Sequence, residues 1–119
     1  MVVFVAHGSR DARWRASVEE AVGVVAAVVG KERVRLAYMD HAPPTLMDVV
    51  ESGMEAGERE IRVAPLFLAS EGHVERDIEP LVEEVRGRWS ELKVELLPPL
   101  GRQPGFLAAL CNIAEGHAE

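Results

Sequence analysis

Four short apolar segments alternate along this chain with four stretches of helical periodicity, and this alternation constrains the fold most. The first segment, from Val2 to Ala6, is continuously apolar, which is typical of a strand buried on both faces. Strands that alternate with helices pair in parallel through right-handed crossovers. We therefore expect one domain over residues 1–119, with a three-layer α/β/α fold and a four-stranded parallel sheet. The expected strands are Val2 to Ala6, Val34 to Met39, Ile61 to Leu68 and Lys93 to Leu97, and the expected helices are Arg13 to Val29, a helix opened by Pro43-Pro44-Thr45, Ile78 to Trp89, and Pro104 to about Ala114.

The first expected helix shows the clearest boundaries. Asp11 is a plausible N-cap and Gly30 a plausible stop. Apolar side chains recur on one stripe between them, which predicts a side that faces the core. The stripe consists of Trp14, Val18, Ala21, Val22, Val25, Val28 and Val29.

Composition narrows the class of protein. The chain has 119 residues, 48% hydrophobic and 28% charged, which is the balance of a globular domain. Its net charge of −7 argues against a nucleic-acid partner. No apolar run approaches a membrane span, and the first apolar run is too short for a signal peptide, so we expect a cytoplasmic protein. Cys111 is the single cysteine and lies in an apolar segment, which predicts a buried, inert thiol and no disulfide or thiolate metal cluster.

Polar residues follow the expected strands at the points where each strand ends. His7 follows the first strand, Asp40 follows the second, and the segment from Ser70 to His73 follows the third. In open α/β sheets, ligands bind outside the carboxyl ends of the strands. The sequence therefore predicts a site at this edge, with both histidines in it.

Several chemistries are open to such a site. Two imidazoles and a carboxylate could hold a divalent metal ion with coordination positions left open, or both histidines could be simple capping residues. Gly8-Ser9 could bind an anion through free backbone N–H groups before a helix. Four arginines near this edge matter only if a substrate carries carboxylates, and are otherwise solvated surface charges. They are Arg10, Arg13, Arg15 and Arg76.

The stretches "VAHGSRD" and "PLFLASEGHVERDIEP" together resemble the short-form sirohydrochlorin cobaltochelatases, the small CbiX-type family of class II tetrapyrrole chelatases. "YMDHAPPTL" looks like the middle segment of the family, and "PPLGRQPGF" looks like its closing segment, so the resemblance covers the whole chain in order. It implies a four-stranded parallel α/β domain that inserts a divalent metal, foremost cobalt, into sirohydrochlorin on the route to cobalamin. It also implies a homodimer, with no organic cofactor.

The resemblance also assigns roles to residues. His7 would be a metal ligand and the proton acceptor, and His73 a second metal ligand. Arg10 and Asp40 would also contact substrate. The family often has Glu at the position of Asp40 and at that of Pro43, and the proline at residue 43 makes no contact by charge. The segment that would line the tetrapyrrole is Leu68, Ala69, Ser70, Glu71, Gly72 and His73.

Rival functions remain open at this stage. A histidine phosphatase would also begin with a strand followed by His-Gly, but it requires Arg where this chain has Ala6. A non-enzymatic module that hands metal to another protein needs the same ligands. Within the chelatases, nickel or iron could replace cobalt, since the same imidazoles suit all three ions. His41 and His117 are expected to lie outside the site, as a solvated loop residue and a tail residue.

Overall fold

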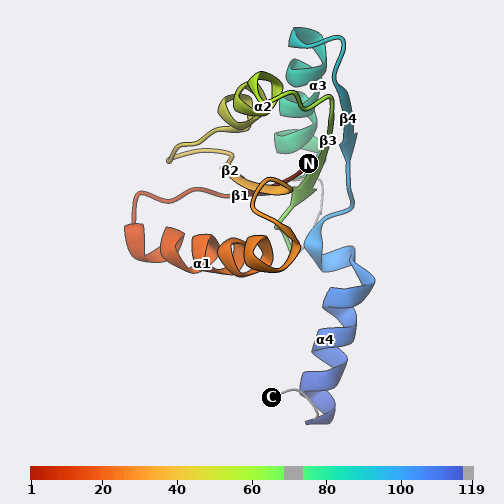
Figure 1. Ribbon diagram of the computed structural model, residues 1–119. Coiled ribbons are helices and arrows are strands. Elements are labelled where there is room, and N and C mark those ends of the chain that lie inside the picture. The colour runs from red at the N-terminus through yellow and green to blue at the C-terminus, as the bar shows by residue number, and fades with distance from the viewer. Residues whose placement is uncertain (69–73, 117–119) are drawn as a thin grey trace.

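The computed structural model describes residues 1–68 and 74–116 (Figure 1); of residues 74 and 75 it describes the backbone alone. Strands and helices alternate as the apolar pattern predicts, and their boundaries agree within a few residues. Two short helical turns, η1 (Val74–Ile78, a π-helical turn) and η2 (Leu100–Arg102, a 3-10 turn), precede α3 and α4. The elements are β1 (Val2–Ala6), α1 (Ala12–Val29), β2 (Val34–Tyr38), α2 (Leu46–Glu55), β3 (Glu60–Pro65), α3 (Glu79–Arg88), β4 (Lys93–Leu96) and α4 (Pro104–Glu115).

The four strands form one parallel sheet in the order β2-β1-β3-β4. Val5 on β1 pairs with Ala37 on one side and Pro65 on the other, so β1 lies in the interior of the sheet. The backbone ladder continues past the strand ends, because Met39 N–H donates to the Ala6 carbonyl and Leu66 N–H to the Val5 carbonyl. The predicted three-layer α/β/α fold with a four-stranded parallel sheet is confirmed.

The main core lies between the sheet and the two helices α2 and α3, which cover one face of it (Figure 1). Val3, Val5 and Val63 contribute from the strands and are almost fully buried. The helices contribute Leu46, Val49, Val50, Val82 and Val85. These apolar positions recur every three or four residues, as expected for helices that bury one side.

The opposite face of the sheet is less completely covered, and two predictions fail there. α1 packs on β2, and it has the predicted Asp11 N-cap and Gly30 C-cap, but none of its residues is buried. Trp14 and Val28, from the stripe expected to face the core, are exposed. Cys111, expected to be buried, is exposed on α4. Helical periodicity shows that a side is apolar, but not that this chain alone covers it.

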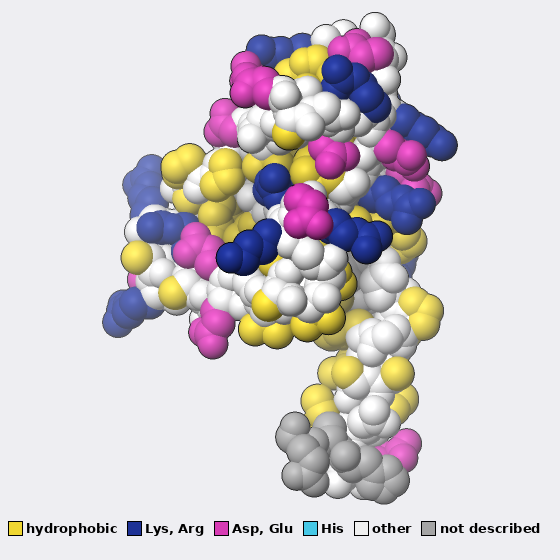
Figure 2. All heavy atoms as spheres, in the orientation of Figure 1, with side chains coloured by type: hydrophobic (Ala, Val, Ile, Leu, Met, Phe, Trp, Pro, Cys, Tyr) yellow, Lys and Arg dark blue, Asp and Glu magenta, His cyan; other side chains and the backbone are white. Residues whose placement is uncertain are grey.

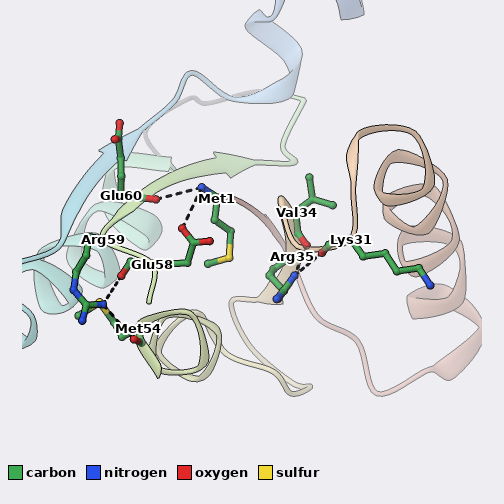
Figure 3. A network of polar contacts seen from close by, with 8 residues as sticks. All are labelled: Met1, Lys31, Val34, Arg35, Met54, Glu58, Arg59 and Glu60. Carbon is green, nitrogen blue, oxygen red and sulfur yellow. Dashed lines mark hydrogen bonds and ion pairs between the residues drawn. The ribbon is translucent and has the colours of Figure 1, made fainter. Parts of the chain in front are cut away.

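Polar contacts at the amino-terminal edge of the sheet tie strands to neighbouring turns (Figure 3). The Met1 amine donates to the Glu60 carbonyl at 3.3 Å and lies 3.8 Å from the Glu58 carboxylate. The Arg59 guanidinium donates to the Met54 and Glu58 carbonyls. These hydrogen bonds provide donors for backbone carbonyl groups at the amino-terminal edge of the sheet, away from the predicted site.

Candidate active site

His7 follows β1 at the carboxyl edge of the sheet, beside the point where the chain reverses its direction of winding. From β1 the chain crosses to β2 on one side, and then returns past β1 to β3 on the other. The loops after β1 and β3 separate at such a switch point, which is where open α/β sheets bind their ligands. The His7 side chain is exposed there. The topology therefore places the first predicted site residue in the expected crevice.

Phe67, which follows β3, forms a wall behind His7. The two rings are stacked, with centroids 4.6 Å apart and planes inclined by 26°. Phe67 itself is buried, and its carbonyl accepts a 3.0 Å hydrogen bond from Gly101 N–H. An aromatic ring against one face of an imidazole limits its rotation and leaves the ring nitrogens at the edge free for a ligand. Phe67 thus orients His7 across the switch point.

The loops after β1 and β2 are joined by Gly8 and Asp40. Gly8 N–H donates to Asp40 Oδ1 at 3.0 Å, and a Cβ on Gly8 would lie 1.7 Å from the Asp40 carbonyl oxygen. Only a glycine allows the two backbones to approach so closely. The second Asp40 oxygen lies 3.7 Å from His41 Nε2. Asp40 therefore holds the backbone next to His7 while its carboxylate stays exposed at the same edge.

A second set of contacts supports these loops from α1. The Arg15 guanidinium donates to the Ser9 carbonyl at 2.5 Å, and one turn later Glu19 accepts a 2.9 Å hydrogen bond from the Tyr38 hydroxyl. Burial of the phenol, followed by the hydrogen bond to Glu19 and its negative charge, raises the pKa of Tyr38 to about 12. α1 therefore fixes the ends of both β1 and β2.

The predicted anion site at Gly8-Ser9 is wrong in one respect, because the Gly8 N–H already donates to Asp40. The arginines also differ from one another. Arg13 is paired with Asp11, and this side-chain hydrogen bond lowers the pKa of the Asp11 carboxyl. Arg15 binds the Ser9 carbonyl, whereas Arg10 is exposed beside the site.

Part of the predicted site lies outside the described residues. Ala69, Ser70, Glu71, Gly72 and His73 fall there, and so does the tail residue His117. Leu68 is described and is exposed, as a residue that lines a ligand would be. Within residues 1–68 and 74–116, His, Cys, Asp and Glu side chains form no group of three or more that could hold a metal ion. The two-histidine metal site therefore stays a prediction.

Sequence reasoning missed Phe67 and the contacts made by Glu19 and Tyr38. The chain has only three Phe residues, and the apolar run that contains Phe67 continues past the end of β3. That combination is a usable signal, because an aromatic residue beyond a strand end lies at the binding edge. The Glu19–Tyr38 pair had no local signal, since 19 residues separate its members.

Comparison with known proteins identifies the family. The model of the CbiX family matches residues 1–115, and this chain belongs to that family. A sirohydrochlorin cobaltochelatase of Methanopyrus kandleri is 36% identical over 90 residues, which are 76% of this chain and 62% of the relative. The chloroplastic sirohydrochlorin ferrochelatase of Arabidopsis thaliana is 28% identical over 100 residues, 84% of this chain and 44% of the relative. This chain thus spans less than two thirds of the length of these relatives.

Solved structures show the same fold. A CbiX protein of Marinobacter aquaeolei VT8 matches with a TM-score of 0.85 and 28% identity, over 97% of this chain and 93% of its own. The sirohydrochlorin chelatase SirB of Bacillus subtilis subspecies spizizenii, solved with cobalt, matches with a TM-score of 0.82 and 20% identity. The match covers 97% of this chain but 49% of SirB, so the fold seen here corresponds to about half of that protein.

Proposed function

We propose that this chain inserts a divalent metal ion, foremost cobalt, into sirohydrochlorin. The observation that carries the proposal is an exposed histidine at the β1/β3 switch point, oriented by a buried aromatic ring, in a member of the CbiX family. Relatives that carry the name sirohydrochlorin cobaltochelatase support the choice of substrate. A cytoplasmic location and a role in cobalamin biosynthesis belong to the same proposal.

The reaction needs two events that an imidazole can serve. Two pyrrole N–H protons must leave the ring, and the metal ion must exchange its ligands for ring nitrogens. A neutral His7 can hold the ion through one nitrogen and can accept a proton when the ion departs. His73 is proposed as the second ligand. A weak, open site of this kind suits an ion that is a substrate, because the ion has to leave.

Iron is the second candidate ion, and a specific observation favours it. One relative is named a sirohydrochlorin ferrochelatase, and one matching SirB structure was solved with Fe3+. Nickel fits the same ligands on chemical grounds. Competition between cobalt, nickel and iron for limiting sirohydrochlorin, followed by the visible spectrum of each product, would establish the preferred ion.

The decisive experiment compares His7→Ala with His117→Ala in that metallation assay. The first variant should lose activity and keep its fold, because the residue is exposed at a loop, and the second should behave as wild type. A His7→Ala variant with a near wild-type rate contradicts the proposal. A protein that binds metal but does not accelerate metallation would be a metal-delivery module instead.

The homodimer implied by the family resemblance is part of the proposal. A single domain of this size offers one shallow edge, whereas a tetrapyrrole is a broad disc. Two copies related by a two-fold axis would present two such edges. In SirB, by comparison, one chain is about twice as long as the fold described here.

A further inference from the structure

His41 lies next to the site, although its place in the sequence favours a solvated loop residue outside it. It follows Asp40 in the loop after β2, and its Nε2 atom is 3.7 Å from Asp40 Oδ2. Asp40 Oδ1 in turn accepts the 3.0 Å hydrogen bond from Gly8 N–H, one residue after His7. His41 and Asp40 therefore present an imidazole and a carboxylate at the edge of the sheet that carries His7.

The backbone at His41 has an uncommon conformation. Its φ is 61°, and among the residues that the structure describes it is the one residue other than glycine with a positive φ. Ala42 N–H donates to the Asp40 carbonyl at 2.8 Å and closes a three-residue turn with His41 at its centre. Such a turn with a positive φ is rare and strained. The imidazole is 54% exposed, so burial of the ring offsets little of this strain.

The loop that carries His41 is held at both ends. At its start, a Cβ on Gly8 would lie 1.7 Å from the Asp40 carbonyl oxygen and 3.2 Å from the Ala42 nitrogen, so the two backbones touch. At its end, Tyr38 N–H donates to the Pro44 carbonyl at 2.8 Å. The fold itself therefore brings Asp40 and His41 together and keeps the strained turn in place, which is typical of residues with a function.

The spacing of the two side chains suits a bound cation. A separation of 3.7 Å is too long for a hydrogen bond, and within the described part of the chain no hydrogen bond occupies Asp40 Oδ2 or His41 Nε2. Bonds of about 2.0–2.2 Å from one ion to imidazole and carboxylate place the two donor atoms about 3–3.5 Å apart. A small movement of the side chains would therefore let both atoms bind one divalent ion, and both donor types bind Co2+, Ni2+ and Fe2+.

The charges near His7 make such a carboxylate necessary. Figure 2 shows Lys and Arg side chains around the start of α1, and Arg10, just before that helix, is exposed. Cations at this edge favour a polyanionic substrate but repel a free metal ion. Asp11 offers little compensation because its carboxylate pairs with Arg13. Asp40 has no Lys or Arg within ion-pair distance in residues 1–68 and 74–116, so its charge is available to attract the ion.

We propose, on the basis of the metal insertion proposed above, that Asp40 Oδ2 and His41 Nε2 form an entry site that captures the divalent ion before it reaches His7. β2 and β3 flank β1 on opposite sides, so this pair lies on the β2 side of His7 and Phe67 on the β3 side. The ion passes from the pair to His7 by exchange of ligands, without a change of oxidation state. Ion and tetrapyrrole then reach His7 from opposite sides.

A metal ion fits His41 better than a carboxylate of the tetrapyrrole does. The Asp40 carboxylate lies 3.7 Å from the imidazole and would repel a second carboxylate at the same place. The same negative charge attracts a cation. His41 therefore belongs to the path of the ion and not to the binding of the tetrapyrrole.

The first test is the binding of Co2+ alone to the full chain, freed of metal beforehand, measured by calorimetry and by the visible absorption of the bound ion. His41→Asn removes the imidazole and keeps a residue that tolerates a positive φ. Its Kd for Co2+ should rise by about tenfold or more, and the absorption should shift because a nitrogen donor is lost. His117→Ala should match wild type. An unchanged Kd and spectrum in His41→Asn overturns the proposal.

The second test asks whether the pair holds an ion without His7. His7→Ala should still bind Co2+, because Asp40 and His41 remain. The double variant His7→Ala, His41→Asn should bind it about tenfold more weakly still. If His7→Ala alone abolishes Co2+ binding, the pair is not an entry site. Circular dichroism of each variant would show that the fold is retained.

The third test is metallation at different Co2+ concentrations. His41→Asn should be slower by about tenfold when Co2+ is limiting, in line with its weaker binding, and should approach wild type when Co2+ saturates. Its KM for sirohydrochlorin should not change. A raised KM for sirohydrochlorin with unchanged Co2+ affinity would assign His41 to the tetrapyrrole and overturn the entry site. Since the first two tests use no sirohydrochlorin, the entry site can fail while the proposed activity stands, and the reverse.

Discussion

At the scale of single residues, the site depends on close backbone contacts as much as on His7. Gly8 lets the loops after β1 and β2 touch, and Gly101 does the same for the segment after β3, where a Cβ would lie 1.6 Å from the Leu68 carbonyl oxygen. Phe67 lies between these contacts and stacks on His7. Adding a methyl group at either glycine would push these backbone segments apart and would therefore change the orientation of the His7 ring.

Gly8→Ala should reduce metallation by roughly tenfold or more and should destabilise the fold by about 1–3 kcal/mol, because the new Cβ forces the Asp40 loop away. The matched control is Gly87→Ala in α3, where nothing lies within 4 Å of a built Cβ. Rates and urea denaturation would be measured on both variants. Equal behaviour of the two would show that the loop contact is unimportant.

Arg10→Gln should mainly raise the KM for sirohydrochlorin, because Arg10 is exposed beside the site and the proposed substrate is a polycarboxylate. The difference from wild type should shrink at high salt, since salt screens exposed charges. Arg13 is already paired with Asp11, so Arg13→Gln should have a smaller effect. If KM does not respond to Arg10→Gln at low salt, Arg10 is only a solvated charge.

Tyr38 predicts a pH effect on stability. Its pKa in the folded protein is raised to about 12 from the ordinary value of 10.0, so folding favours the protonated phenol. The stabilisation is complete below pH 10 and is lost as the pH rises through about 12. Tyr38 is the only tyrosine, so tyrosinate absorbance reports it directly. A midpoint near 10 in the folded protein would contradict the buried hydrogen bond to Glu19.

At the scale of elements, α2 begins next to the site, and its first turn has a well-defined cap. α2 starts with a capping box, in which Asp48 N–H donates to Thr45 Oγ1 at 3.1 Å and Thr45 N–H donates to Asp48 Oδ2 at 3.0 Å. The residue before this cap, Pro44, accepts a hydrogen bond from Tyr38 N–H. The start of α2 therefore helps to position the loop that carries Asp40.

Thr45→Ala should lower the free energy of unfolding by about 1 kcal/mol, because it leaves a helix N–H without its acceptor. Thr45→Ser keeps the hydroxyl and should retain most of the stability. Urea denaturation at several probes would measure both. A Ser variant as destabilised as the Ala variant would show that the methyl group, and not the cap, matters.

At the scale of the whole molecule, the chain has one well-packed face and one that is partly open. α2 and α3 complete the first face, whereas α1 and the projecting α4 leave apolar surface on the second. Isolated apolar residues on a surface are common, but a contiguous exposed apolar patch is a sign of an interface. Assembly is therefore expected to contribute to stability.

The thermal midpoint should consequently rise with protein concentration, because a dimer is stabilised by mass action. Scans across a hundredfold range of concentration would measure this for wild type and for Leu110→Asp, which places a charge on the exposed apolar side of α4. The variant should show a lower midpoint that does not change with concentration. A wild-type midpoint that stays constant would mean that the single chain is already the complete folding unit.

The sequence alone determined the alternation of strands and helices, the cap at Asp11, and the position of His7 at a strand end. These features depend on periodicity and on hydrogen bonds between residues a few positions apart, so short stretches of the sequence are enough to identify them. The sequence also placed His73 after the third expected strand, and the family resemblance added the role of metal ligand for both histidines; His73 lies outside the described residues.

Only the tertiary structure decided which distant residues meet. Phe67 stacks on a histidine 60 positions earlier, Gly8 contacts the loop of Asp40, and the Tyr38 hydroxyl reaches Glu19. It also decided that no residue of the α1 stripe is fully buried and that Cys111 is exposed, although both were expected to be buried. An apolar pattern shows that a side chain favours burial, but the surface that buries it is set by the packing of the whole molecule.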